Sequence, residues 1–125
     1  MLLHLQSALP SLAGRPWLDY LAWFVGGAAL INAIPHLTAG LMGRAFQSPF
    51  AKPPGQGLSS SRTNVLWGAV NLILAYLLLV HVGRFDFGSG VDMGVASLGG
   101  LLIGLVCAHG FGRFNGGNGP SDKPS

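Results

Sequence analysis

The sequence is most lipid-like at residues 72–80, which run Leu72-Ile73-Leu74-Ala75-Tyr76-Leu77-Leu78-Leu79-Val80. The flanking residues from 64 to 82 add no charged side chain. An α-helix rises about 1.5 Å per residue, so about 20 apolar residues cross the hydrocarbon core of a bilayer. Residues 64–82 therefore predict a transmembrane helix.

Two further segments of the same kind flank this one. Residues 17–42 are apolar apart from Asp19 near their start, and residues 91–111 form the third apolar segment. Only 9% of the 125 residues are charged, whereas soluble domains carry about a quarter. We expect an all-α membrane protein with three transmembrane helices. Pro35 removes a backbone donor inside the first helix, which predicts a kink or break there.

The basic residues predict how the chain is oriented. Three spans place the two ends of the chain on opposite sides of the membrane. Arg15 and Arg84 fall on one side, and five basic residues fall on the other: Arg44, Lys52, Arg62, Arg113 and Lys123. Cytoplasmic loops are enriched in Lys and Arg. We therefore expect the N-terminus outside and the C-terminus in the cytoplasm.

The chain divides into three parts. Residues 1–16 are expected to be a short interfacial segment, because their leucine-rich run is interrupted by Pro10 and is too short to span a bilayer. Residues 17–112 hold the three-helix transmembrane domain. Residues 113–125 are rich in Gly, Asn, Pro and Ser and are expected to be a flexible tail.

The loop between the first two spans is rich in proline, which favours extended backbone. Its candidate recognition residues, for a protein partner or a lipid, are Pro49, Phe50, Lys52, Pro53 and Pro54. Phe46 and Phe50 are apolar residues in a polar loop, so we expect part of it to lie on the membrane surface or to fold back against the helices. The serines at 59–61 supply candidate N-caps for the next helix.

Small residues recur every fourth position in the third span. They are Ala96, Gly100, Gly104 and Ala108. A four-residue spacing places them on one helix face, and such a face allows close helix packing in membranes. We expect it to pack against other membrane protein subunits or against a second copy of the chain.

Two histidines fall at similar depths in the inner half of the predicted bundle. His36 follows Pro35 in the first span, and His109 lies near the end of the third. Together they are candidate axial ligands of haem or a pigment; a metal site or a proton relay is also open. The favoured interpretation is that both are structural or interfacial, with no cofactor bound. Asn32 and Asn71, near the bilayer centre, are expected to hydrogen-bond across helices.

The sequence lacks the signatures of several other classes of function. The sequence has no Walker loop, no Cys-pair zinc spacing and no His-Glu-x-x-His motif. Its seven Lys and Arg residues are scattered singly, which is not the basic patch of a nucleic-acid-binding protein. We expect a protein that is not an enzyme and binds no nucleic acid.

Three segments carry a resemblance to a known family. They are Asn-Ala-Ile-Pro-His at residues 32–36, Ser-Pro-Phe-Ala-Lys-Pro-Pro-Gly-Gln-Gly-Leu-Ser-Ser at residues 48–60, and Asn-Val-Leu-Trp-Gly at residues 64–68. With these segments the chain resembles a family of small bacterial integral membrane proteins without a known activity. The resemblance covers about residues 30 to 70 and implies a multi-pass protein of the bacterial inner membrane. It implies no site residues.

Three functions follow from these observations as expectations. The first is a non-enzymatic accessory or scaffold subunit that packs through helix faces onto a larger membrane complex or onto itself. The alternative is a haem- or pigment-binding membrane protein with His36 and His109 as axial ligands. A weaker alternative is a small transporter or channel formed by oligomers.

Overall fold

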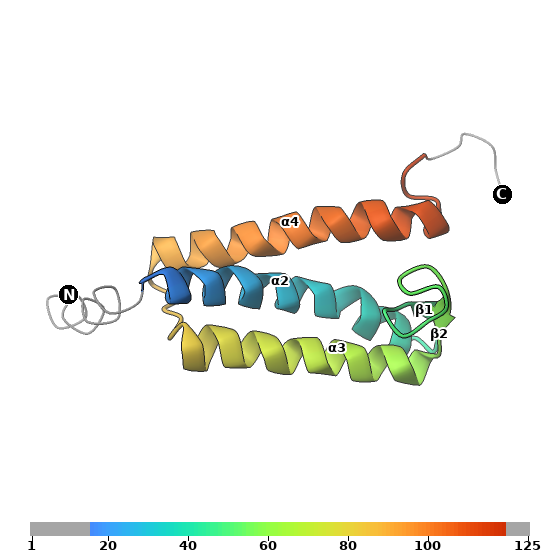
Figure 1. The fold of residues 1–125 in the computed structure, drawn as a ribbon, viewed down its shortest axis with the longest axis horizontal. Helices are drawn as coiled ribbons and strands as arrows, with labels where there is room; N and C mark the ends of the chain where they lie inside the picture. Colours follow the sequence, from blue (N-terminus) through green and yellow to red (C-terminus); the bar gives the residue numbers. More distant parts are fainter. Residues whose placement is uncertain (1–15, 120–125) are drawn as a thin grey trace, which may run out of the picture.

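Three long helices form an open bundle in the computed structural model, which describes residues 16–119 (Figure 1). The helices are α2 (Pro16–Leu41), α3 (Ser61–Tyr76) with its π-helical continuation η1 (Leu77–Val82), and α4 (Gly90–Asn115). By length and composition, three segments are able to cross a membrane: Trp17–Leu41, Ser61–Val82 and Gly90–Asn115. The prediction of three transmembrane helices is confirmed to this extent. The interfacial segment predicted at residues 1–16 falls, except for Pro16, outside the described residues, and so does the tail from residue 120.

The helix boundaries differ from the predicted ones where capping groups set them. Helix α3 begins at Ser61, three residues before the predicted start, because the Ser60 hydroxyl caps it by accepting a hydrogen bond from the Thr63 amide at 3.2 Å. Helix α4 continues past the predicted end at Phe111 to Asn115, so residues 113–115 of the expected tail are helical. It stops at Gly116, whose φ of 80° suits glycine.

Pro35 lies inside α2, which continues through it to Leu41. The helix is therefore not interrupted at the proline. The bend that the sequence predicts there remains a prediction.

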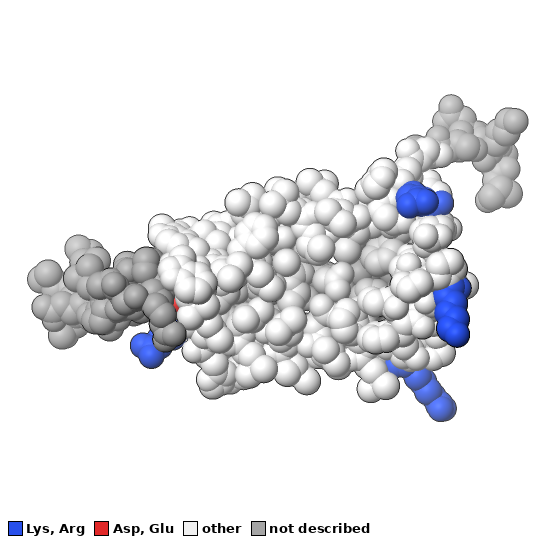
Figure 2. Space-filling view, viewed as in Figure 1, with Lys and Arg blue, Asp and Glu red and all other residues white. Residues whose placement is uncertain are grey.

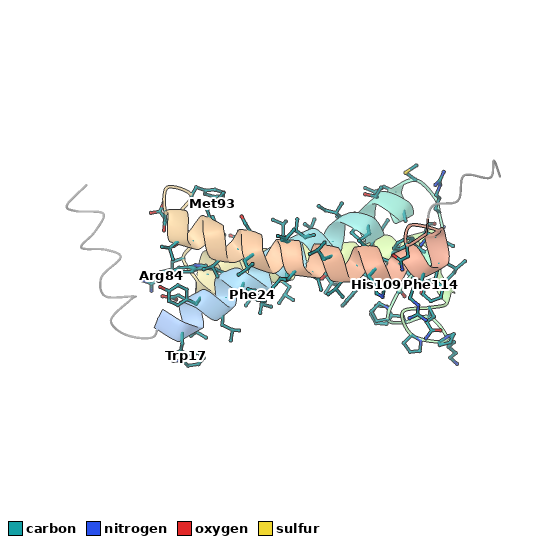
Figure 3. The ribbon with its side chains drawn as sticks, turned by 90° about the horizontal axis from the view of Figure 1, so that it is seen from above. Trp17, Phe24, Arg84, Met93, His109 and Phe114 are labelled. Atoms are coloured by element: carbon teal, nitrogen blue, oxygen red, sulfur yellow. The ribbon has the colours of Figure 1, made fainter. Side chains whose placement is uncertain are left out.

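Helix α2 is the centre of the bundle. It packs along both α3 and α4, whereas α3 and α4 make few contacts with each other. Helix α4 crosses over α2, as seen from above in Figure 3. Glycines allow this close crossing: a Cβ on Gly27 would overlap the backbone of Ala96, and a Cβ on Gly99 would overlap the carbonyl of Phe24. Close backbone approach is the usual role of such residues in membrane helices.

The predicted small-residue face of α4 is used partly inside the chain. The backbone of Ala96 meets Gly27, and Gly100 is buried against Ile31 of α2. Gly104 makes only ordinary contact with Ile31, and Ala108 is exposed. The first half of the face is therefore occupied by α2. Ala96 and Gly100 pack against the first helix of the same chain, and not, as expected, against another subunit or a second copy.

Small side chains fill the interior, and large apolar ones point outward. The buried apolar residues are mainly alanines, such as Ala29, Ala33 and Ala75, whereas Leu66 and Val106 are among many exposed aliphatic residues. A soluble protein buries large apolar side chains by preference. This inverted distribution fits a bundle surrounded by lipid.

The loop between α2 and α3 closes one end of the bundle. It contains a short antiparallel pair, β1 (Phe46–Gln47) and β2 (Leu58–Ser59), with Phe46 opposite Ser59 and Gln47 opposite Leu58. We call residues 42–60 the cap, and the end that they cover the capped end. The opposite end, where residues 83–89 connect η1 to α4, is the turn end (Figure 1).

Candidate functional site

A buried histidine lies at the centre of the capped end. His36 of α2 is 2% exposed, and its Nδ1 lies 2.8 Å from Oδ1 of Asn64 in the first turn of α3. The Asn64 amide nitrogen faces three backbone carbonyl oxygens, of Phe46, Ser59 and Ser60, at 3.1–3.2 Å. Carbonyls only accept, so this nitrogen donates and Oδ1 is the acceptor. In this arrangement His36 donates from Nδ1, and Asn64 joins α2, α3 and both strands of the cap.

Three aromatic rings surround the His36 imidazole. Phe46 of the cap and Phe111 of α4 each approach it edge-on, with ring centroids at 5.8 Å. Trp67 of α3 is edge-on at 6.4 Å. The histidine is thus the point where all three helices and the cap meet. The prediction that the loop folds back against the helices is confirmed at Phe46.

The cap is fastened by its own side chains and by α4. The hydroxyls of Ser48 and Ser59 lie 2.5 Å apart, and the Ser48 hydroxyl also accepts from the Phe50 amide at 3.1 Å. The Ser48 carbonyl accepts from the Gly55 amide at 2.8 Å. Buried Gln47 accepts a bond of 3.2 Å from Asn115 near the end of α4. These contacts tie the cap to itself and to the end of α4.

The predicted recognition residues lie on the outside of this fastened cap. All five, Pro49, Phe50, Lys52, Pro53 and Pro54, are exposed. Phe50 is 62% exposed although one edge of its ring contacts Trp67, with centroids 5.2 Å apart. A backbone held from within therefore presents an aromatic ring, a lysine and prolines to the surroundings.

The capped end is positively charged. Its exposed cations are Arg44 and Lys52 in the cap, Arg62 in the first turn of α3 and Arg113 in the last turn of α4. The carboxylates of the described chain, Asp19, Asp86 and Asp92, belong to the turn end. Figure 2 shows blue side chains gathered at the capped end and an uncharged middle on the face in view. This end suits contact with anionic groups.

His109 lies at the capped end, as its predicted depth requires, but it does not face His36. Figure 3 shows it on α4 near Phe114. Phe111 is the α4 residue that contacts His36, and two residues along an α-helix correspond to about 200° of rotation. His109 is accordingly exposed. Within one chain, the two histidines therefore do not form a pair of ligands on opposite faces of a haem.

A second polar contact lies halfway along the bundle. Asn32 of α2 donates to Asn71 of α3 at 3.1 Å, and Asn71 donates to the Trp67 carbonyl at 2.9 Å. The predicted hydrogen bond between Asn32 and Asn71 is confirmed. The Cys107 thiol of α4 adds a weak contact of 3.4 Å to the side-chain oxygen Oδ1 of Asn32. Thr38, a further polar residue of α2, is exposed.

Some residues of the site were not identified from the sequence. Gln47, Ser48 and Asn115 lie in polar segments without periodicity, and a two-residue strand is too short to predict. A signal did exist on α3, where the buried residues are Asn64, Gly68, Asn71 and Ala75. Their spacing of four, three and four marks one helix face. The indole N–H of Trp67, beside this face, is buried and has no hydrogen-bond acceptor among the described residues.

No group of three or more His, Cys, Asp or Glu side chains that could hold a metal ion occurs among residues 16–119. Comparison of the chain with protein-family models, with curated proteins and with solved structures gave no match.

Proposed function

We propose that this chain is a non-enzymatic accessory subunit of a membrane complex and that the outer surface of the cap binds its partner protein. The three apolar helices anchor the chain in the bilayer. In this proposal the membrane is the bacterial inner membrane, with the N-terminus outside and the cap and C-terminus in the cytoplasm. The basic residues at the capped end support that orientation, and so does the resemblance of residues 30–70 to small bacterial membrane proteins.

The observation that carries the proposal is the contrast between the two sides of the cap. On the inner side, Asn64 and Ser48 hold the backbone in place through several hydrogen bonds. On the outer side, Phe50 keeps 62% of its surface exposed. A simple connection between two helices needs neither feature. Binding residues are commonly found on loops that a rigid scaffold positions, and a preordered loop loses less entropy on binding.

The chemistry of the exposed surface describes the partner. Phe50 offers an aromatic anchor, which is a frequent hot spot of protein interfaces. Lys52, with Arg44 and Arg62 at the same end of the bundle, favours a partner segment that carries carboxylates. The partner surface should therefore be apolar at its centre and acidic at its edge, and it should lie at the membrane–water boundary.

The surroundings of His36 support a structural role for the buried histidine. Its Nδ1 is engaged by Asn64, and its ring is enclosed by three aromatic side chains. A histidine in a proton relay or in catalysis needs access to a substrate or to water. His36, at 2% exposure, lacks that access.

Site-specific photocrosslinking tests the proposed surface. A photoreactive phenylalanine analogue replaces Phe50 in cells, and a matched control places it at Leu66, which is similarly exposed at 68% but lies on α3. We expect a discrete protein adduct from position 50 and none from position 66. The charge reversal Lys52→Glu should weaken the adduct.

The same experiment has a clear contrary outcome. Only lipid adducts at position 50, or the same protein adducts at both positions, would contradict the proposal. An unchanged adduct yield in Lys52→Glu would show that the partner does not bind Lys52 through carboxylates.

A further inference from the structure

An apolar groove runs along the turn-end half of the bundle, between η1 and α4. Its volume is about 790 Å³. The floor is α2, at Gly27, Leu30 and Ile31, and the walls come from α3 with η1 on one side and α4 on the other. The groove exists because both outer helices pack on α2 and make few contacts with each other. It is distinct from the cap and from the surface proposed to bind a partner protein.

The length of the groove matches one leaflet of a bilayer. On α4 its lining runs from Met93 to Leu105, which is twelve residue steps or about 18 Å at 1.5 Å per residue. Half of a hydrocarbon core about 30 Å thick is about 15 Å. A transmembrane helix of a partner crosses both leaflets and would meet this groove over only half its length. An acyl chain begins at the interface and ends near the bilayer centre, as the groove does.

The chemistry along the groove also fits a lipid. The lining is apolar except for Ser97 and the Tyr76 side chain, so the occupant carries almost no polar group along its length. At the turn end the lining includes Phe85 and Phe87, and the residue before Phe85 is the exposed Arg84. Figure 3 places Arg84 and Met93 at this same end of the bundle. A guanidinium there suits the phosphate of a lipid headgroup.

We propose that the groove is a binding site for one phospholipid of the leaflet at the turn end, with an acyl chain along Gly27, Gly100 and Leu101 and the phosphate at Arg84. Such a lipid contacts protein on three sides. It should therefore exchange more slowly than the lipids that touch the convex surfaces of the same helices. The site adds a lipid partner to the chain and does not depend on the proposed binding of a protein by the cap.

Photolabelling in vesicles tests the site. The full chain is reconstituted in phosphatidylethanolamine vesicles containing phosphatidylglycerol with a diazirine in its acyl chain, and the labelled residues are mapped by mass spectrometry. Two pairs compare the groove with a convex surface at matched exposure: Leu101 (60%) with Leu98 (51%), and Tyr76 (55%) with Ile73 (59%). We expect labelling to favour Leu101 and Tyr76. Equal labelling within each pair would overturn the proposal.

Variants that fill the groove provide the second test. A Cβ on Gly104 would meet only Ile31, at 3.7 Å, so the side chain of Gly104→Leu is accommodated and enters the groove. The matched control is Gly110→Leu on the same helix, where nothing lies within 4 Å of the new Cβ and the position does not line the groove. Native mass spectrometry of the detergent-solubilised chain should detect one retained phospholipid in the wild type and in Gly110→Leu, and none in Gly104→Leu.

The headgroup contact has its own variant. Arg84→Gln should lower the retained lipid on the order of tenfold, because a charge-assisted hydrogen bond to phosphate is lost, whereas Arg113→Gln at the capped end should not. Retention that is the same in the wild type and in Gly104→Leu would overturn the proposal. A dimer that shields Leu101 and Tyr76 from the diazirine would overturn it as well, in favour of a second copy as the occupant.

Discussion

Replacing Asn64 by alanine should open the cap without unfolding the helices. The Asn64 side chain is fully buried and makes the contacts that join the cap to α2 and α3. In Asn64→Ala, the carbonyls of Phe46, Ser59 and Ser60 lose a donor and His36 loses its acceptor. Most of the cap's remaining hydrogen bonds lie within the cap itself, and ring contacts such as Phe46 with His36 and Phe50 with Trp67 still join it to the helices. Because the internal bonds persist, the cap should open as a unit.

The magnitude follows from the number of bonds lost. The Asn64 amide nitrogen has two hydrogens, so it donates at most two strong bonds among its three carbonyl neighbours. With the bond from His36, three hydrogen bonds are lost, each contributing about 1 kcal/mol net. The free energy of opening the cap should fall by about 3 kcal/mol. Since 1.4 kcal/mol is a factor of ten, the opened population should rise on the order of a hundredfold.

Hydrogen–deuterium exchange measures this population. The chain in detergent micelles is digested after exchange, and the peptide that contains the Gly55 amide, which bonds to the Ser48 carbonyl at 2.8 Å, is followed by mass spectrometry. Exchange through local opening reports the free energy of that opening. The helical peptides of α3 and α4 serve as internal references and should keep their wild-type rates.

A graded control comes from Asn115→Ala. Its side chain makes a single bond of 3.2 Å to the cap, through Gln47, from an exposed position. We expect a loss below about 1 kcal/mol and a rate increase below about fivefold. If Asn64→Ala changes the exchange of the cap no more than Asn115→Ala does, the assignment of Asn64 as the main fastening of the cap is refuted.

The remaining predictions concern packing, topology and cofactors. In SDS-induced unfolding, Gly99→Ala should cost about 1–3 kcal/mol because its Cβ overlaps a backbone carbonyl of α2, whereas Gly110→Ala, with no neighbour within 4 Å, should be neutral or stabilising by up to about 1 kcal/mol. Asn32→Leu should cost less than about 1 kcal/mol in the same assay, because its partner on α3 keeps a backbone acceptor; a loss well above that value would contradict the weak role assigned to this pair. Reporter fusions at Lys52 and at the C-terminus should both show a cytoplasmic location, and a periplasmic signal at either site would reverse the proposed orientation. The visible absorption spectrum of the purified protein should show no Soret or pigment band. A band that disappears in His36→Ala would support the haem or pigment alternative.

The positions of the helices were predictable from the sequence because lipid selects for hydropathy over about 20 residues. The hydropathy pattern places the middle of each helix but not its ends. Those depend on single capping groups, Ser60 at the start of α3 and Gly116 at the end of α4. The serine run did predict a cap at the first of these sites.

Depth along the membrane normal was also predictable, and rotation about each helix axis was not. Asn32 and Asn71 were expected at the same depth, and they bond. His36 and His109 were also expected at similar depths, but the rotation of α4 turns Phe111 toward His36 and His109 outward. Rotation is set by how the glycines of two helices fit together. A four-residue spacing shows that small residues share one helix face, but it does not show which helix that face contacts.

Predicting the contact between His36 and Asn64 requires the path of the loop as well as the positions of the helices. Asn64 is the first residue of the predicted span 64–82, a place where asparagine is a common cap. In the structure Ser60 performs the capping, which leaves the Asn64 side chain to bind the cap and His36. The sequence presents several equivalent candidates for the capping role, and only the path of the cap distinguishes among them.

The hydrogen bonds that join α2 to the segment from α3 to Gly83 pair residues in antiparallel order. Trp23 bonds to the Gly83 carbonyl at 2.8 Å, Asn32 to Asn71, and His36 to Asn64. Both residues of all three pairs are present in the chain once residue 83 has been synthesised. At about 5–20 residues per second, the ribosome needs about 2–6 s more to reach Asn115. During that interval every residue of these three pairs is already in the chain, so the hydrogen bonds that fix the register of α2 against α3 need no residue of α4. The glycines of α4 pack on an α2 surface whose register against α3 is set by other residues.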